Sequence, residues 1–399
     1  MDKPTPCPNG PGAPRNAADD TIDTLAELVL AAYPPERLAR IRSRSEHTWN
    51  SAHADTAYDD RISYVMPAME DPPATQHIGV PGDATDVQRE MIYQLKAMVD
   101  WSCVDGEYYP GFMSGLEQVT IPSMFGCVKE NISQSNHIKP ILRSPSDVWS
   151  LPPAEIREGA VCHYFLNRMA YKYRRLGGRI PVYMTDVQGP FSCAAQIWGI
   201  QDFLLALDEH PDEAHRLLSL CTGAIIQFFH AMYGVTDGTL IPIHCHPMVW
   251  VPRDCGVAVS DDFFAVVGPR TVREFSMPYL EKIGETFGGV TAHTCGNMNH
   301  LPATLNEMKT LRALNFGATE TDLFKYAGEC DPRITILAHK TPDCCFGLPR
   351  LNDIEHLRLC ARTQRETGVK VFCTMPCGVA HRASPENRKL WADAARLQP

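Results

Sequence analysis

The most informative stretch of the chain for chemistry is residues 289–297, which reads Gly-Val-Thr-Ala-His-Thr-Cys-Gly-Asn. Its β-branched and apolar first half predicts a strand, and side chains on a strand point alternately to opposite faces. His293 and Cys295 would therefore project to the same side, one behind the other. An imidazole and a thiolate placed in this way can bind one zinc ion.

A further thiol comes from the C-terminal part of the chain, where the β-rich run 369–372 leads toward Cys377 and a glycine. If both strands end at one rim of a barrel, His293, Cys295 and Cys377 form a zinc site with one open position, as catalytic zinc sites do. A thiol bound there would lose its proton, because coordination stabilises the thiolate. Spacing alone leaves an alternative open, in which these are unconnected residues and the cysteines belong to the core.

Two histidines form a rival metal motif, because His244 and His246 flank Cys245 and share one face of another predicted strand. We favour the alternative that they are a hydrogen-bonded pair that lines a substrate pocket. His339, which also follows a predicted strand, is expected to contact substrate as well. The adjacent pair at 344–345 cannot face one site from a strand, so these cysteines are interpreted as loop or core residues.

Carboxylates follow two other segments. Asp186 comes after a predicted strand and just before Gly189-Pro190, so it is either an active-site carboxylate or a helix N-cap. Asp261 and Asp262 precede an apolar segment and are typical of a helix cap, with contact between Asp261 and the substrate as the alternative.

From residue 99 onward, strand-like and helix-like segments alternate, which predicts βαβ units and a parallel sheet. The strand candidates are 101–104, 180–185, 240–245, 290–295, 311–316, 334–338 and 369–373, and the helix candidates are 154–176, 199–207, 213–233, 271–287, 298–308, 321–327, 353–366 and 384–397. Roughly eight such strands close as a (β/α)8 barrel, with catalytic groups at the C-terminal ends of the strands. The list is one strand short of this number. A doubly wound open sheet is the alternative, although no Gly-x-Gly-x-x-Gly follows a strand.

The chain divides into three predicted parts. Residues 1–19 are rich in Pro, Gly and Asn and are predicted to be a disordered tail. Residues 20–98 are predicted to be an N-terminal helical extension, interrupted by Pro34-Pro35 and containing a short strand at 61–67. Residues 99–399 are the predicted barrel.

Charge and cysteine usage indicate the compartment and exclude some partners. The net charge is −10, and the one dense basic patch, Arg37 to Arg44, lies among glutamates, which argues against nucleic acid and anionic membranes as partners. The fifteen cysteines and the lack of a secretory signal favour reduced thiols in a cytoplasmic protein. Most are interpreted as buried apolar residues, among them Cys103, Cys162, Cys193, Cys221 and Cys360.

One apolar segment, residues 217–236, contains no Asp, Glu, Lys or Arg and is long enough to cross a bilayer. Its serine, threonines, glutamine, histidine and two glycines make it too polar for a typical span, so a buried helix is predicted.

Several motifs together resemble those of the uroporphyrinogen decarboxylase superfamily, over about residues 60–396. The resemblance rests on residues 180–191 and 273–283, on His293-Thr-Cys295-Gly, and on Cys377-Gly-Val with the later Ser-Pro-Glu-Asn at 384–387. It implies a (β/α)8 barrel fold.

Within this superfamily the chain resembles one branch more than the other. True decarboxylases carry an N-terminal Arg-Gln-Ala-Gly-Arg signature, which is missing here, and a His-Gly-Val where this chain has Cys377. The corrinoid-dependent methyltransferases of the methylcobalamin:coenzyme M type bind zinc through His-x-Cys and a later Cys before Gly. His293, Cys295 and Cys377 match that pattern.

The resemblance implies zinc as cofactor and a corrinoid such as methylcobalamin as co-substrate, with transfer of a methyl group to or from a small thiol or methylated substrate. The chain has no Asp-x-His-x-x-Gly cobalamin motif, so the corrinoid is expected from a partner corrinoid protein or from solution. A metal-independent decarboxylase and a non-catalytic barrel subunit are the alternatives, and a homodimer is left open.

Overall fold

The chain is an α/β protein built on a parallel sheet, as its alternating pattern predicts. The computed structural model describes residues 15–54, 60–70, 72–115, 117–132, 135–243, 248–341, 347–348, 350–375 and 381–397. The main sheet has six parallel strands in the order β1-β9-β8-β7-β6-β5. These are β1 (Ser63–Tyr64), β5 (Val257–Ser260), β6 (Val290–His293), β7 (Leu311–Gly317), β8 (Thr335–His339) and β9 (Val371–Thr374).

The strands that the sequence predicts best are the apolar, β-branched ones, β6 to β9. The strand missing from the prediction is β5, which has only four residues and lies between two short 3-10 helices, Arg253–Cys255 and Asp262–Ala265. The predicted strand at 101–104 is wrong, because α3 (Asp86–Trp101) continues to Trp101. β1 lies in the segment expected to form the helical extension, yet it pairs with β9 through Ser63 and Phe372.

Backbone pairing continues beyond β5 without further regular strands. Segment 180–188 makes a parallel bridge to β5 on one side and to residue 112 on the other, and it also bridges Ile241. The amide of Glu107 donates to the carbonyl of Tyr64 in β1 at 2.8 Å. The predicted strands at 180–185 and 240–245 are therefore present only as isolated bridges within their described residues.

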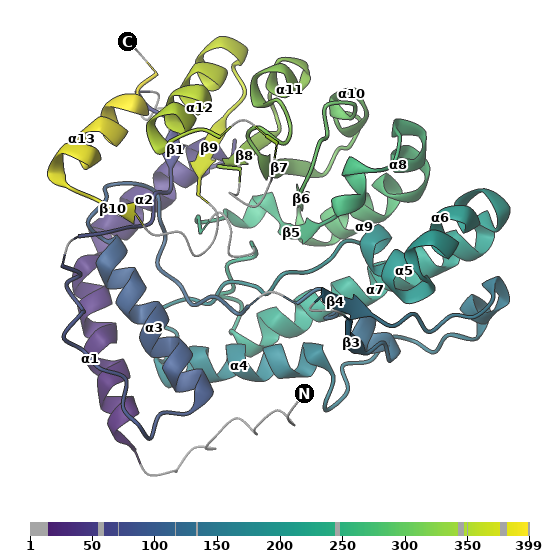
Figure 1. Cartoon of the computed structure of the whole chain (residues 1–399), viewed down its shortest axis with the longest axis horizontal. Helices are drawn as coiled ribbons and strands as arrows, with labels where there is room; N and C mark the ends of the chain where they lie inside the picture. The colour runs from purple at the N-terminus through teal and green to yellow at the C-terminus, as the bar shows by residue number, and fades with distance from the viewer. Residues whose placement is uncertain are drawn as a thin grey trace.

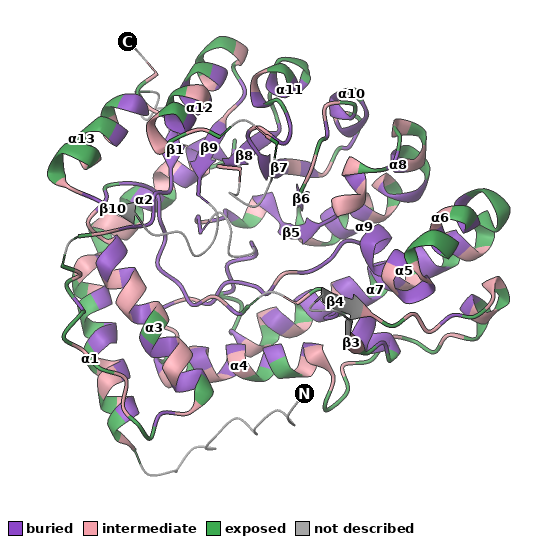
Figure 2. Ribbon diagram, viewed as in Figure 1, coloured by how far each residue is buried: buried purple, intermediate pink, exposed green. Residues whose placement is uncertain are grey.

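Helices form an outer layer around the strands (Figure 1). In chain order they are α1 (Ala17–Ala32), α2 (Pro35–Thr48), α3, α4 (Val161–Arg175), α5 (Pro190–Trp198), α6 (Ile200–Glu209), α7 (Pro211–Val235), α8 (Pro269–Phe275), α9 (Met277–Phe287), α10 (Pro302–Leu305), α11 (Leu323–Glu329), α12 (Asp353–Thr367) and α13 (Pro385–Ala394). The helices carry buried faces toward the strands and exposed faces outward (Figure 2), the pattern of amphipathic helices on a sheet.

Two small sheets accompany the main one. β2 (Ala68–Met69) pairs in parallel with β10 (His381–Arg382), which brings a segment near each end of the chain together. β3 (Lys129–Ile132) and β4 (Ser135–Ile138) form an antiparallel hairpin.

The apolar segment at 217–236 forms most of α7. Leu217, Phe228 and Phe229 are fully buried in this helix. Among the described residues, α7 is the one helix with the length and apolar content to span a membrane, a property that core helices of soluble proteins share.

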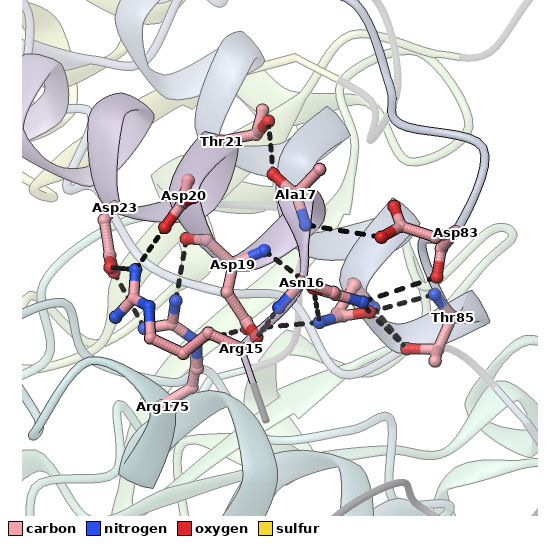
Figure 3. Close-up of polar contacts among 11 residues, drawn as sticks. Arg15, Asn16, Ala17, Asp19, Asp20, Thr21, Asp23, Asp83, Thr85 and Arg175 are labelled. Atoms are coloured by element: carbon pink, nitrogen blue, oxygen red, sulfur yellow. Dashed lines mark hydrogen bonds and ion pairs between the residues drawn. The ribbon is translucent and has the colours of Figure 1, made fainter. Parts of the chain in front are cut away.

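The N-terminal end of α1 is fixed by a capping box (Figure 3). The Asn16 side chain accepts from the amide of Asp19 at 3.0 Å, and the Asp19 carboxylate accepts from the amide of Asn16 at 3.2 Å. Because the helix begins at Ala17, the predicted tail 1–19 is wrong for its last residues, which are helical.

An arginine links α1 to α4 (Figure 3). Arg175, at the end of α4, donates to Asp19 at 2.9 Å and to Asp23 at 2.7 Å. Burial opposes ionisation of both carboxyls. Arg175 outweighs it together with the amide of Asn16 and the side chain of Gln88 at Asp19, and together with Arg15 at Asp23, so the pKa of Asp19 and the pKa of Asp23 are lowered.

Candidate metal centre at the ends of the parallel strands

His293 and its neighbours lie at the C-terminal ends of adjacent parallel strands. His293 is the last residue of β6, and its register partner in β7 is Asn315. Asn315 is in turn paired with Leu337 in β8, the strand that ends at His339. Parallel pairing therefore brings three polar side chains to one edge of the sheet.

Asn315 fixes the tautomer of His293. The Asn315 Nδ2 donates to the carbonyl of Leu337 at 2.6 Å, so its Oδ1 faces the imidazole and lies 2.6 Å from His293 Nδ1. An amide oxygen only accepts, so Nδ1 carries the proton and Nε2 presents its lone pair. Nε2 lies 3.3 Å from Cys295 Sγ. Metal-binding histidines are commonly oriented in this way by a hydrogen bond to the other ring nitrogen.

Asp262 is the third donor of this group, and the sequence did not identify it as a ligand. Its Oδ1 accepts from the amide of Cys295 at 2.8 Å. The ligand atoms of Asp262, His293 and Cys295 all lie within 4.8 Å of one another. Oxygen, nitrogen and sulfur donors are all used by zinc.

The surroundings of Asp262 favour a cation. Burial is the largest influence and raises the pKa of Asp262, and the negative charges of Asp186 and Glu320 act in the same direction. The amide of Cys295 and the charge of His293 oppose this effect. A positive ion between these groups would relieve the repulsion among the carboxylates.

Cys295 is accessible and its loop depends on a glycine. Of the ten cysteines that the structure describes, Cys295 alone is exposed. Gly296 has φ +119°, and a Cβ on it would lie 2.7 Å from the Cβ of Ala265. Such a φ and such a contact are tolerated only without a side chain, which explains the glycine after Cys295.

Asp186 lies at the same end of the sheet. One carboxylate oxygen accepts from Ser260 Oγ at 2.6 Å and the other from Gln188 Nε2 at 3.0 Å. The alternative that it caps a helix is wrong, because α5 begins at Pro190 with Gly189 as its N-cap.

Asp261 lies beneath these groups rather than among them. Its side chain is fully buried and accepts from Ser192 Oγ at 3.0 Å, while its amide donates to the carbonyl of His293 at 2.7 Å. Burial raises the pKa of Asp261 to about 7. The structure brings Asp261 to the base of the site, and its contact with a substrate stays a prediction.

His339 joins the group from β8. Its Nδ1 lies 3.4 Å from Asn315 Nδ2, and its ring centroid lies 5.9 Å from that of His293. The predicted metal ligand Cys377 and the predicted pocket residues His244 and His246 lie outside the described residues, as does the pair at 344–345. Their roles stay predictions.

A second group that could bind a metal lies in the core. It consists of His356, Cys360 and Cys373, all buried. The sequence placed Cys360 among the core cysteines, and burial is found for Cys162, Cys193, Cys221 and Cys360, while Cys103 is half-buried.

Comparison with known proteins shows what part of the chain and its fold resemble. The family model "Uroporphyrinogen decarboxylase (URO-D)" matches residues 117–238. A methyltransferase from Methanosarcina mazei has a similar structure, with a TM-score of 0.59 and 14% sequence identity over 89% of this chain and 98% of that chain. A comparison with curated protein sequences finds no match. These findings agree with the resemblance that the motifs indicate: residues 117–238 are similar to the uroporphyrinogen decarboxylase family, and the chain shares its α/β fold with a methyltransferase.

Proposed function

We propose that the protein is a zinc-dependent methyltransferase that moves a methyl group between a corrinoid and a small thiol or methylated substrate. The observation that carries the proposal is the convergence of Asp262, His293 and Cys295 within 4.8 Å at the C-terminal ends of the parallel strands. His293 and Cys295 are two of the three zinc donors that the resemblance to the methyltransferase branch implies, and Asp262 is an oxygen donor beside them.

The proposed scaffold is a closed (β/α)8 barrel. Closure would run from β5 through segment 180–188 and residues 107–112 back to β1, along the backbone contacts described above. This arrangement supplies about eight parallel segments and gathers the ends of β5 to β9 at one mouth. The likeness to a methyltransferase over most of both chains supports it.

His293 Nε2 and Cys295 Sγ would hold the zinc ion, with Cys377 as the third ligand that the family resemblance implies. Asp262 is a further donor that the geometry adds. When bound, zinc would act as a Lewis acid that keeps a substrate thiol in its thiolate form or polarises a methylated heteroatom.

The chain's own residues would orient this chemistry. Asn315 keeps the proton of His293 on Nδ1, which leaves Nε2 as a ligand. Asp186, fixed by Ser260 and Gln188, would position a polar or proton-bearing group of the substrate. His339 would line the same mouth, together with the predicted contacts His244, His246 and Asp261.

The corrinoid is proposed to come from a partner corrinoid protein or from solution, and methylcobalamin is the simplest form to test. The proposal includes a cytoplasmic location without nucleic-acid or membrane partners, and a homodimer stays open.

The experiment that tests the function is incubation of the zinc-loaded chain with methylcobalamin and a panel of small thiols, followed by the cobalamin absorbance. Demethylation that requires zinc and is lost in Cys295→Ser supports the proposal. A metal-independent decarboxylase would instead release carbon dioxide from porphyrinogen carboxylates in the presence of a chelator. A binding subunit would carry out neither reaction.

A further inference from the structure

The buried group of His356, Cys360 and Cys373 lies between α12 and the main sheet, apart from the candidate active site. His356 and Cys360 are four residues apart on α12, so they project from one helix face toward Cys373 in β9. All three side chains are fully buried, and their ligand atoms lie within 4.8 Å of one another.

The orientation of His356 is set by two backbone carbonyls. Its Nε2 lies 3.2 Å from the carbonyl oxygen of Ala338 and 3.2 Å from that of Thr374. Carbonyl oxygens only accept, so Nε2 carries the proton and Nδ1 carries the lone pair. This Nδ1 is buried and has no hydrogen-bond partner among the residues that the structure describes. A buried acceptor without a partner is unfavourable, so it calls for an explanation.

The ionisation of the group is consistent with a ligand role for the imidazole. Burial lowers the pKa of His356 to about 4, so the ring is neutral at neutral pH. Burial is also the main cause that raises the pKa of the Cys373 thiol, with Cys360 contributing. A thiolate charge at this depth would need a cation beside it.

We propose that Nδ1 of His356 and the Sγ atoms of Cys360 and Cys373 bind a thiophilic d10 cation, zinc or cuprous copper, in a buried structural site that links α12 to β9. Binding forms two metal–sulfur bonds and one metal–nitrogen bond and releases the two thiol protons to solvent, with no change in oxidation state. Soft thiolate donors select these two metals. The charge of two thiolates matches zinc, whereas a site with three donors suits cuprous copper.

The test uses the full chain, purified under reducing conditions and loaded with Zn²⁺ or with Cu⁺ kept reduced. Metal per chain is measured by mass spectrometry for the wild type, Cys360→Ala, Cys373→Ala and Cys221→Ala. Cys221 is a matched control, because it is also fully buried on a helix and belongs to neither metal group. We expect each of the first two variants to bind one metal ion fewer than Cys221→Ala, and the preferred metal identifies the cation.

A second measurement distinguishes this site from the candidate active site. It substitutes none of the three residues of this buried group, so it does not require a variant at these positions to fold. The double variant Cys295→Ser/Cys377→Ser removes both thiols of the proposed active site but leaves His356, Cys360 and Cys373 intact. This variant, loaded with Co²⁺ as a zinc substitute, should still show sulfur-to-cobalt charge-transfer absorbance if the cation is zinc, and should still bind one Cu⁺ if the cation is copper. Equal metal content in Cys360→Ala and Cys221→Ala with both cations, or neither cobalt absorbance nor bound Cu⁺ in the double variant, would overturn the proposal without affecting the proposed methyl transfer.

Discussion

The Oδ1 atom of Asn315 lies 2.6 Å from Nδ1 of His293, and the same amide is fixed because its Nδ2 donates to the carbonyl of Leu337. The orientation of the proposed zinc ligand therefore depends on a residue that would not touch the metal. Such supporting residues typically contribute about 10–100-fold to metal affinity.

Asn315→Leu should weaken zinc binding by about 10–100-fold, because His293 loses the acceptor that fixes its tautomer. Asn315→Asp is the matched control, since an aspartate at this position keeps an acceptor for Nδ1. Zinc affinity is measured by competition with a chelating dye. Equal affinities for the leucine and aspartate variants would show that this hydrogen bond does not orient the ligand.

Asp262→Asn tests whether the carboxylate is a ligand. The asparagine keeps an acceptor for the amide of Cys295 but loses the negative charge, so zinc affinity should fall by about tenfold or more. The matched control is Asp261→Asn, which changes a fully buried carboxylate next to it in the sequence. Unchanged affinity in the Asp262 variant would remove this residue from the ligand set.

Gly296→Ala should destabilise the chain by about 1–3 kcal/mol, because its φ of +119° suits only glycine and the new Cβ would meet Ala265. The displaced loop should also bind zinc less tightly. Gly223→Ala in α7 is the control, as a Cβ there meets nothing within 4 Å and alanine favours a helix. Urea unfolding gives the free energy of unfolding of each variant. A Gly296 variant as stable as the Gly223 variant would contradict the account.

Arg175→Met should lower the free energy of unfolding at pH 6 by on the order of 1–2 kcal/mol, because two carboxylates lose a charged donor. The folded-state pKa of Asp19 and that of Asp23 are below the unfolded value of 3.8. The stabilisation is therefore complete above that pH and is lost as the pH falls through the folded-state values.

The difference between wild type and Arg175→Met should accordingly shrink as the pH is lowered from 6 toward 3, as measured by urea titration at each pH. Arg174→Met, which changes an exposed neighbour on the same helix, should show no such trend. A difference that stays constant with pH would mean that these ion pairs do not stabilise α1.

How well a strand could be predicted from the sequence depended on its length. β6 to β9 were predicted because each is an apolar run followed by a helix signal. β5 was missed, since four residues between two short 3-10 helices carry little periodicity. Because β5 was not predicted, the sequence did not place Asp262 just after the end of a strand, and this residue was not identified as a ligand.

The candidate site was only partly predictable, because the residues that contact His293 from other strands depend on which strands are neighbours. His293 and Cys295 share a local motif, so spacing was enough to propose them. Asn315 becomes a partner of His293 only when β7 is known to lie beside β6. Likewise, His356 and Cys360 have helical spacing, but Cys373 reaches them only through the packing of α12 on β9.

The most direct test of the central claim is the zinc content and methyl-transfer activity of Cys295→Ser beside Cys103→Ser. Cys103 is half-buried and its Sγ donates to the carbonyl of Ala68, so it belongs to neither metal group. We predict that Cys295→Ser loses one zinc ion and all zinc-dependent demethylation of methylcobalamin, while Cys103→Ser keeps both. Full zinc content and activity in Cys295→Ser would contradict the account.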